Sequence, residues 1–269
     1  MPPGPIALFG SGETSRRGRQ VHSELMSRLP APVKVAILET PAGFQPNVTV
    51  VSGKLRAFFE TSLGQYQPTI SIVPARQRGG IFDPDSPQIV AALNDAQYIF
   101  AGPGSPTYTV RHLQGTRTLE AICRRHAEGA TLSFASAAAI AMGRFALPVY
   151  EIYKVGDDLH WQPGLDIFKP LGLDLAVLPH WNNNEGGTEL DTSHCFMGVE
   201  RFRYLRRLLP RETVILAIDE HTACVLDPAE GTGFVMGAGK VCVIRTDLEK
   251  QLENGETFSL ELLRSCSLV

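Results

Sequence analysis

The chain has 269 residues, enough for one large domain or two small ones, and its formal net charge is -3. A chain with so little net charge does not have the excess of basic residues that nucleic-acid-binding proteins usually carry, so we expect no nucleic-acid partner. No apolar run is long enough to cross a bilayer, and residues 1–5, MPPGP, lack the charged and apolar regions of a secretory signal. We therefore expect a cytoplasmic protein with no membrane partner.

The cysteines give no sign of a metal site or of a disulfide framework. They are odd in number, far apart and never in a CxxC spacing: Cys123, Cys195, Cys224, Cys242 and Cys266. Structural zinc sites and secreted disulfide scaffolds need paired or closely spaced cysteines, so we expect neither of them.

Short apolar runs alternate with helix-length amphipathic segments along the first two thirds of the chain. The expected strands are residues 6–9, 33–38, 69–73, 98–101, 131–135 and 175–178. The expected helices between them include residues 21–29, 48–62 and 118–128. This rhythm predicts an α/β fold in three layers, in which a mostly parallel sheet has helices on both faces. Continuous apolar strands such as VAIL fit burial on both sides.

The last third of the chain has a different pattern. Four short apolar segments, VILAID, TACVLD, GFVMG and KVCVIR, are separated by Asp, Gly and Pro. Strands so short and so closely spaced usually pair in an antiparallel way, which predicts an antiparallel extension of the sheet. No repeat, low-complexity segment or linker divides the chain, so we expect one domain over residues 1–269.

Five loops follow the carboxyl ends of the expected strands, where open parallel sheets bind their ligands. They are GSGET (10–14), ETPAGFQPN (39–47), AGPGSPTY (101–108), FASAAA (134–139) and PHWNNNEGG (179–187). GSGETS lacks the Lys-Ser/Thr ending of a phosphate-binding loop, and GPGSP does not match GxGxxG. We therefore expect no nucleotide site.

The segment LSFASAAAIAMG (132–143) has one hydroxyl, that of Ser136, where an apolar strand passes into an alanine-rich helix. Its small neighbours permit the sharp strand-to-helix turn of a nucleophile elbow. The first amides of the helix would face an oxyanion formed at this serine. If Ser136 is a nucleophile, its backbone angles should be strained and its Oγ should lie about 2.6–3.2 Å from a histidine nitrogen.

A serine nucleophile needs a base, and the chain offers seven histidines. His180 directly follows LAVLP, at a strand end on the same side of the sheet as Ser136, and is the best placed. His194 and His221 are lesser options. The remaining four are expected to be solvated, on charged helix faces or in an exposed loop: His22, His112, His126 and His160.

A carboxylate should in turn orient the imidazole. Glu151 follows the apolar segment ALPVY, which leads away from the elbow helix, so it is expected to be partly buried. Glu185 and Asp191, in the loop after His180, are alternatives. The residues alone leave this choice open.

At these positions the chain resembles the cyanophycinase and aspartyl dipeptidase (peptidase E) family of serine peptidases, within the class I glutamine amidotransferase-like fold. FASAAA stands where the family has an elbow close to GTSAGA, and LPHW stands at the segment of its base. ERFRYLRRLLP, LAIDEHTACVLDP, MGAGKVCVIRTD, ALFGSGET and IFAGPGSPTYTV resemble further family segments in the same order. The similarity runs from about residue 5 to about residue 246.

The resemblance implies that Ser136 is the nucleophile, His180 the base and Glu151 the orienting acid. It also implies an enzyme that needs no cofactor and acts on small peptides or isopeptides, with a preference for acidic ones. Members of the family commonly form homodimers, so we expect a homodimer here.

Two loops supply candidate substrate contacts. Gly12 and Glu13 lie in the opening loop, and an insertion after His180 adds a polar cluster: Asn182, Asn183, Asn184, Glu185, Asp191 and His194. Such a cluster either recognises a substrate or caps its own loop. The spacing of its acids and its histidine matches no standard set of zinc ligands.

Two departures from the family pattern concern the elbow and the oxyanion hole. Phe134 and Ala138 replace the two elbow glycines, so Phe134 is expected to narrow or reshape the pocket and the elbow to widen slightly. Pro103 removes one backbone donor. If an oxyanion contact falls there, the transition state loses on the order of 3–4 kcal/mol.

The leading hypothesis is a serine-type hydrolase. His180 would take the proton of Ser136, an acyl-enzyme would form, and the amides of Gly104 and Ala137 would hold the oxyanion. The alternative is a binding protein on the same scaffold that has lost catalysis, because a fold does not determine a function. A glutamine amidotransferase would need a cysteine at position 136 and is discounted.

Overall fold

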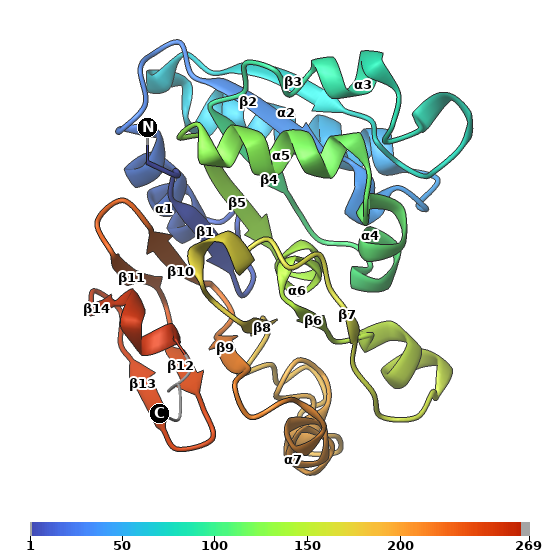
Figure 1. Cartoon of the computed structure of the whole chain (residues 1–269), viewed down its shortest axis with the longest axis vertical. Helices are drawn as coiled ribbons and strands as arrows, with labels where there is room; N and C mark the ends of the chain where they lie inside the picture. The colour runs from blue at the N-terminus through green and yellow to red at the C-terminus, as the bar shows by residue number, and fades with distance from the viewer. Residues whose placement is uncertain (1, 265–269) are drawn as a thin grey trace.

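The computed structural model describes residues 2–264, so Cys266 lies outside the described residues. Its main sheet has eight strands, and the five from β1 to β3 in the order below run parallel (Figure 1). The order is β14 (Thr257–Ser259), β11 (Thr232–Gly237), β10 (Thr222–Asp227), β1 (Ile6–Phe9), β5 (Thr131–Ala135), β4 (Tyr98–Ala101), β2 (Lys34–Leu38) and β3 (Thr69–Val73). β10, β11 and β14 pair antiparallel, which confirms the predicted C-terminal extension for TACVLD and GFVMG, whereas VILAID and KVCVIR belong to the second sheet described below.

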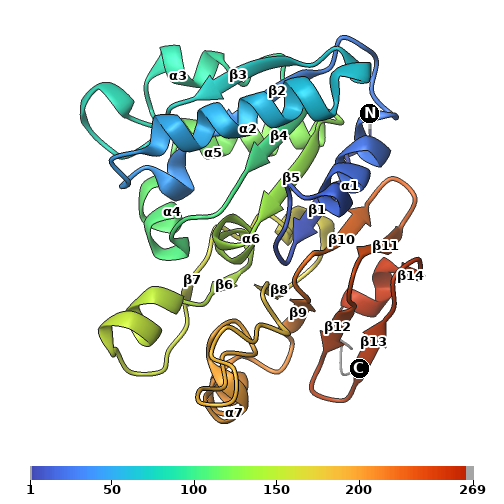
Figure 2. The ribbon, with the colours of Figure 1, turned by 180° about the vertical axis from the view of Figure 1, so that it is seen from behind.

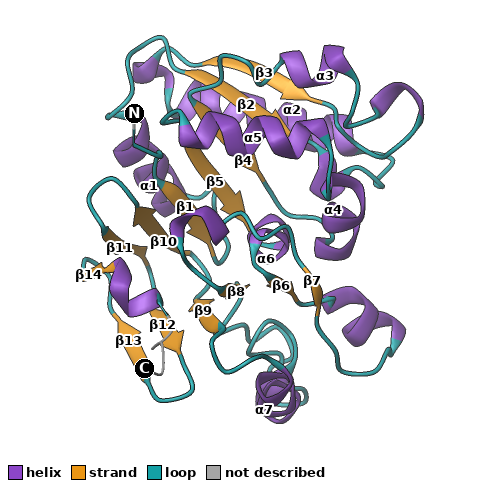
Figure 3. Cartoon of the chain, viewed as in Figure 1, coloured by secondary structure: helices purple, strands orange, loops and turns teal. Residues whose placement is uncertain are grey.

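Helices cover both faces of this sheet, as Figures 1 to 3 show. Consecutive residues of β4 point to opposite faces of the sheet. Ile99 belongs to the buried cluster that includes Ile122 of α5. Phe100 belongs to the cluster on the other face, with Leu25 of α1 and Phe59 of α2. The helices are α1 (Arg16–Met26), α2 (Val48–Ser62), α3 (Pro87–Ala91), α4 (Pro106–Leu113), α5 (Arg117–Ala127), α6 (Ala137–Met142) and α7 (Gly198–Leu208). The predicted three-layer α/β architecture is confirmed.

A second sheet of four strands lies beside the first. Its order is β13 (Glu249–Leu252), β12 (Val241–Ile244), β9 (Val214–Ile218) and β8 (Leu175–Leu178). The expectation that residues 175–178 join the main parallel sheet is wrong, because β8 pairs with β9 instead. The chain after β8 still returns to the main sheet, since the His180 N–H donates to the carbonyl oxygen of Gly10 at 3.3 Å.

Between α6 and β8 the chain makes an excursion away from both sheets. β6 (Phe145–Ala146) pairs with β7 (Gln162–Pro163), and the residues between them include the short π-helical segment η4 (Glu151–Val155). Figure 3 shows this helix at the lower right, beyond the end of the β6–β7 ribbon. It carries side chains that reach the site described below.

Within residues 2–264, no helix combines the length and the apolar character that a membrane span requires. The four cysteines that the structure describes are free thiols, and Cys195, Cys224 and Cys242 are buried.

His22 is buried in the core, so the expectation that it is solvated is wrong. Its ring stacks on Phe9 at a centroid distance of 5.0 Å and lies within 2.6 Å of the Tyr98 hydroxyl through Nδ1. Its Nε2 donates to the carbonyl oxygen of Glu13 at 3.1 Å, which attaches the loop after β1 to the core. Burial lowers the pKa of His22 to about 3, so the ring is neutral at physiological pH. His126 is also buried and bonds the Gly4 carbonyl oxygen at 2.8 Å.

The neutral His22 predicts a stability that falls in acid. The unfolded chain takes up this proton near pH 6.5 and the folded chain only near pH 3. The unfolded state therefore binds more protons between these values. The free energy of unfolding is therefore unaffected by His22 above pH 6.5. It falls as the pH drops toward 3, by up to roughly 5 kcal/mol.

Urea unfolding at pH 4.5 and pH 7 measures this dependence. We expect His22→Gln to lose much of the difference between the two pH values, and His160→Gln, at an exposed histidine, to retain it. An unchanged pH dependence in His22→Gln would show that other groups cause it.

Candidate active site

Ser136 occupies a strained turn between β5, which ends at Ala135, and α6, which begins at Ala137. Its backbone angles are φ 52° and ψ -118°, a combination that residues with a side chain rarely adopt. Its N–H donates to the carbonyl oxygen of Phe9 at 3.2 Å, which ties the turn to the neighbouring strand β1. A sharp, strained turn from a strand into a helix is also the form that nucleophile elbows take.

The two residues that replace the elbow glycines do not obstruct the turn. Phe134 is fully buried and packs in the core on the α5 side of the sheet, and it does not line the cavity beside Ser136. The expectation that it narrows or reshapes that pocket is therefore wrong. Ala138 is also fully buried, and its methyl group is small enough for the core it enters. The elbow keeps its form because both side chains point into the packed interior.

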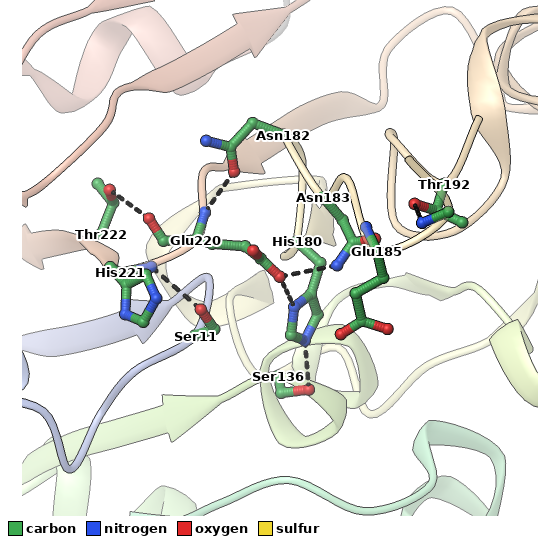
Figure 4. A network of polar contacts seen from close by, with 11 residues as sticks. Ser11, Ser136, His180, Asn182, Asn183, Glu185, Thr192, Glu220, His221 and Thr222 are labelled. Atoms are coloured by element: carbon green, nitrogen blue, oxygen red, sulfur yellow. Dashed lines mark hydrogen bonds and ion pairs between the residues drawn. The ribbon is translucent and has the colours of Figure 1, made fainter. Parts of the chain in front are cut away.

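His180 lies two residues after the end of β8 and faces Ser136. Its Nε2 is 2.8 Å from Ser136 Oγ, so the structure brings together the two residues that the sequence pairs. His180 itself has a φ of 53°, and its ring packs against that of Phe196 at a centroid distance of 5.5 Å. Figure 4 shows the ring between the serine on one side and a carboxylate on the other.

That carboxylate belongs to Glu220, and the expectation that Glu151 orients His180 is wrong. Glu220 stands in the turn between β9 and β10, and its Oε1 lies 3.0 Å from His180 Nδ1 (Figure 4). Glu151 lies at the start of η4, in a neighbouring cavity of about 440 Å³. The reason is topological: β9 and β10 belong to different sheets, and the turn between them reaches the site from the side opposite η4.

A signal for Glu220 is present in the sequence. In the segment LAIDEHTACVLD, Glu220 stands two residues after the end of an apolar strand, as His180 does in LAVLPHW. Both side chains therefore leave strand ends of the second sheet. The strand pairing of β8 with β9, which brings the two ends together, is the step that sequence reasoning missed.

Glu220 is held in its ionised form. Partial burial opposes ionisation, but hydrogen bonds from Asn183 and His180 outweigh it and keep the pKa of Glu220 below its ordinary value. An ionised carboxylate only accepts hydrogen bonds, so His180 Nδ1 carries a proton and donates a hydrogen bond to Glu220. In the neutral imidazole, Nε2 then carries no proton and accepts the hydrogen bond from the Ser136 hydroxyl. This is the tautomer that a general base requires.

Two asparagines of the insertion support Glu220. The buried Asn183 donates from Nδ2 to Glu220 Oε1 at 2.9 Å and accepts at Oδ1 from the Glu185 N–H at 3.1 Å. Asn182 Oδ1 accepts from the Glu220 N–H at 2.8 Å. The sequence predicts both asparagines as substrate contacts, but in the structure their side chains make hydrogen bonds within the protein. Asn184 is exposed in the turn that follows.

The other polar residues of the insertion have different surroundings. Glu185 is exposed and lines the cavity beside Ser136, where Figure 4 shows it next to His180. Asp191 accepts hydrogen bonds from Ser193 and Val199, which lower its pKa and cap the loop. Within residues 2–264, no three His, Cys, Asp or Glu side chains gather in a group that could hold a metal ion.

The insertion ends in a left-handed turn that packs against the histidine. Three consecutive residues have positive φ: His194 (55°), Cys195 (59°) and Phe196 (68°). The turn is attached to the β8 loop, because the N–H groups of His194 and Cys195 donate to the carbonyl oxygens of Trp181 and His180. Strained backbone of this kind persists only where its surroundings enforce it, and it is commonest at functional sites.

Gly104 and Ala137 line the cavity beside Ser136. Neither backbone amide donates to an acceptor within the part of the chain that the structure describes. Gly104 has no room for a side chain, because a Cβ there would lie 1.8 Å from the carbonyl oxygen of Pro41. Pro103 is exposed and does not line this cavity, so the donor that it lacks is not one the cavity needs.

Gly12 and Glu13, in the loop after β1, do not line the cavity. Gly12 (φ 69°) packs against His221, since a Cβ would lie 2.3 Å from its Nδ1. Burial raises the pKa of Glu13, and the nearby His180 and His221 oppose that rise only in part. Their predicted role as substrate contacts has no support in this arrangement.

The cavity has a volume of about 340 Å³ and is bounded by four parts of the chain. Gly104 comes from the loop before α4 and Pro106 is the first residue of that helix, while Ala137 and Ile140 come from α6. The remaining walls are the η4 excursion, with Val149, Tyr150, Tyr153 and Lys154, and the insertion after His180, with Glu185, Cys195 and Phe196. Ser136 and His180 both reach this space, so a bound molecule can contact the serine hydroxyl directly.

No protein-family model and no curated protein matches the sequence. Among solved structures, a peptidase from an acI-B1 Actinobacterium is similar with a TM-score of 0.75 at 21% identity, over 96% of this chain and 97% of that one. A candidate peptidase E from Listeria monocytogenes EGD-e is similar with a TM-score of 0.52 at 16% identity, over 90% of this chain and 98% of that one. The chain therefore shares its overall fold with these two proteins.

Proposed function

We propose that this protein is a serine-type hydrolase that cleaves a peptide or amide bond in a short peptide through an acyl-enzyme. The observation that carries the proposal is the connected series Ser136, His180 and Glu220 at a strained elbow, with contacts of 2.8 and 3.0 Å. Nucleophile, base and orienting acid in hydrogen-bond sequence are the recurring arrangement of serine hydrolases on unrelated folds.

In the first step His180 Nε2 takes the proton of the Ser136 hydroxyl while Oγ attacks the carbonyl carbon of the substrate. The imidazolium that forms keeps its Nδ1–H bonded to the ionised Glu220, which stabilises the positive charge. The carbonyl oxygen becomes an oxyanion and accepts hydrogen bonds from the Gly104 and Ala137 amides. One such donor is worth about 3–4 kcal/mol in the transition state.

In the second step the tetrahedral intermediate breaks its carbon–nitrogen bond. His180 gives the proton from Nε2 to the departing amine, which leaves the acyl group on Ser136. Water then attacks the acyl carbon while His180 takes its proton, and Ser136 Oγ leaves and is reprotonated. The strained elbow and the fixed imidazole lower the reorganisation that these steps require.

Two independent lines support a peptidase rather than another serine hydrolase. The order of motifs in the chain resembles that of the cyanophycinase and peptidase E family. The two solved structures that share the fold are described as peptidases, one as a candidate peptidase E.

Ser136 should react with a fluorophosphonate probe, since this electrophile traps an activated serine. We expect labelling of the native protein at Ser136, located by peptide mass spectrometry. Ser136→Ala should abolish labelling and reduce peptide turnover on the order of 10⁴-fold or more, with little change in thermal stability. Binding of peptides without any labelling would favour a binding protein on the same scaffold.

The acid that orients His180 can be identified with two matched substitutions. Glu220→Gln should lower kcat by about 10²- to 10⁴-fold, because a neutral partner no longer enforces the tautomer or stabilises the imidazolium. Glu151→Gln should leave kcat nearly unchanged, because Glu151 does not contact His180. Steady-state kinetics on one peptide substrate compares the two. A larger loss in Glu151→Gln than in Glu220→Gln would reverse the assignment.

A further inference from the structure

The cavity beside Ser136 has mostly apolar walls. Ile140 comes from α6, Val149 from the excursion before η4, and Tyr153 from η4 itself, while Phe196 projects from the left-handed turn. Ile140 is 3% exposed and Val149 is 7% exposed, so both are fixed in the packed interior. The cavity volume of about 340 Å³ is near the lower end of ligand sites and suits one residue of a short peptide.

The charges around the cavity do not favour an acidic side chain. Its only cationic side chain, among residues 2–264, is the exposed Lys154, whose Nζ lies 4.7 Å from the ring centre of Tyr153. The exposed Glu185 lines the same cavity with the opposite charge. No arginine lines the cavity, so the described residues offer no bidentate partner for a substrate carboxylate.

Further negative charge lies close behind the cavity walls. Glu220 is ionised on the far side of His180, and Glu151 lines the adjacent cavity, which shares Tyr150 with the first. Glu151 Oε2 is buried and has no hydrogen-bond partner within residues 2–264. Arg111 lines that second cavity but not the first. Arg201 lies behind the same wall, with its Cζ 6.0 Å from the ring centre of Tyr153, but its guanidinium donates to the carbonyl oxygens of Met197 and Phe196 and does not line the cavity. A carboxylate placed beside Ser136 would therefore lose its hydration, and the exposed Lys154 is the one cation among the described residues that lines the cavity beside it.

We infer that this cavity binds an uncharged, apolar or aromatic side chain of a residue flanking the cleaved bond, and that it discriminates against Asp and Glu. The inference rests on the proposed peptidase function for the identity of the ligand as a peptide. It reverses the acidic preference that the family resemblance implies. Its basis is the composition of the cavity walls around Tyr153 and Phe196, together with the surrounding acids.

Binding to the inactive Ser136→Ala variant tests the inference without turnover. The ligands are dipeptides with Leu, Asn or Asp at each position in turn, with free and with acetylated amino termini. The three side chains are similar in size, so Asn separates the effect of polarity from that of charge. By titration calorimetry we expect Leu to bind at least tenfold more tightly than Asp at one position, with Asn between them. Equal or tighter binding of Asp at both positions, or no binding of any peptide, would overturn the inference.

A charge placed in the wall should change the preference. Tyr153→Arg adds a cation inside the cavity and should shift the Leu-to-Asp affinity ratio toward Asp by tenfold or more. Val155→Arg adds the same charge to the same segment at a side chain that is 75% exposed and does not line the cavity, so it should leave the ratio unchanged. An equal shift in both variants would assign the preference to the general field rather than to the wall. The calorimetry with the Ser136→Ala variant does not depend on a substitution in the cavity wall, so it tests the inference even if Tyr153→Arg does not fold.

Failure of the inference can be told apart from failure of the proposed function. Fluorophosphonate labelling of Ser136 together with faster cleavage of Asp peptides would retain the hydrolase and overturn the apolar preference. Tight binding of Leu peptides by a protein that is never labelled would retain the preference and overturn the hydrolase.

Discussion

The backbone of Ser136 is the constraint on which the rest of the site depends. A residue with a side chain at φ 52° and ψ -118° costs about 1–3 kcal/mol, and the surroundings must offset that cost. They do so because β5 lies between β1 and β4 in the middle of the main sheet, and the alanines after Ser136 are buried against it. The hydroxyl is thereby raised above the sheet edge, where His180 meets it.

The same kind of strain recurs in the segments that surround the serine. His180 and His221 have positive φ, and so do all three residues of the turn His194–Phe196. His221 lies in the turn between β9 and β10, whereas His180 and the turn His194–Phe196 lie in the single connection between β8 and α7. The two parts of that connection are held together by backbone hydrogen bonds such as His194 N–H to the Trp181 carbonyl oxygen. Residues in such conformations fix side-chain directions closely, which suits a catalytic group more than an adaptable binding surface.

The residues of the site come from the strand ends of two different sheets. The main sheet presents Ser136, and the second sheet presents His180 and Glu220 from neighbouring strand ends. Asn182 and Asn183 attach Glu220 to the same loop as His180, so the imidazole and the carboxylate are held in place relative to each other. The insertion predicted to contact a substrate thus serves first to fix the acid, and only Glu185 of its acids reaches the cavity.

The sequence by itself determined the layered fold, the strands that carry the site, and the pair Ser136 and His180, because apolar periodicity, small-residue turns and strand-end loops are local signals. Which acid meets His180 was decided only by the tertiary structure. Glu220 is 40 residues further along the chain, and it reaches Nδ1 because β8 pairs with β9 in a second sheet. His22 was misjudged for the same reason, since its burial depends on how α1 packs on the sheet rather than on its charged neighbours in sequence. Long-range strand pairing and helix packing are set by the whole core, and no short segment encodes them alone.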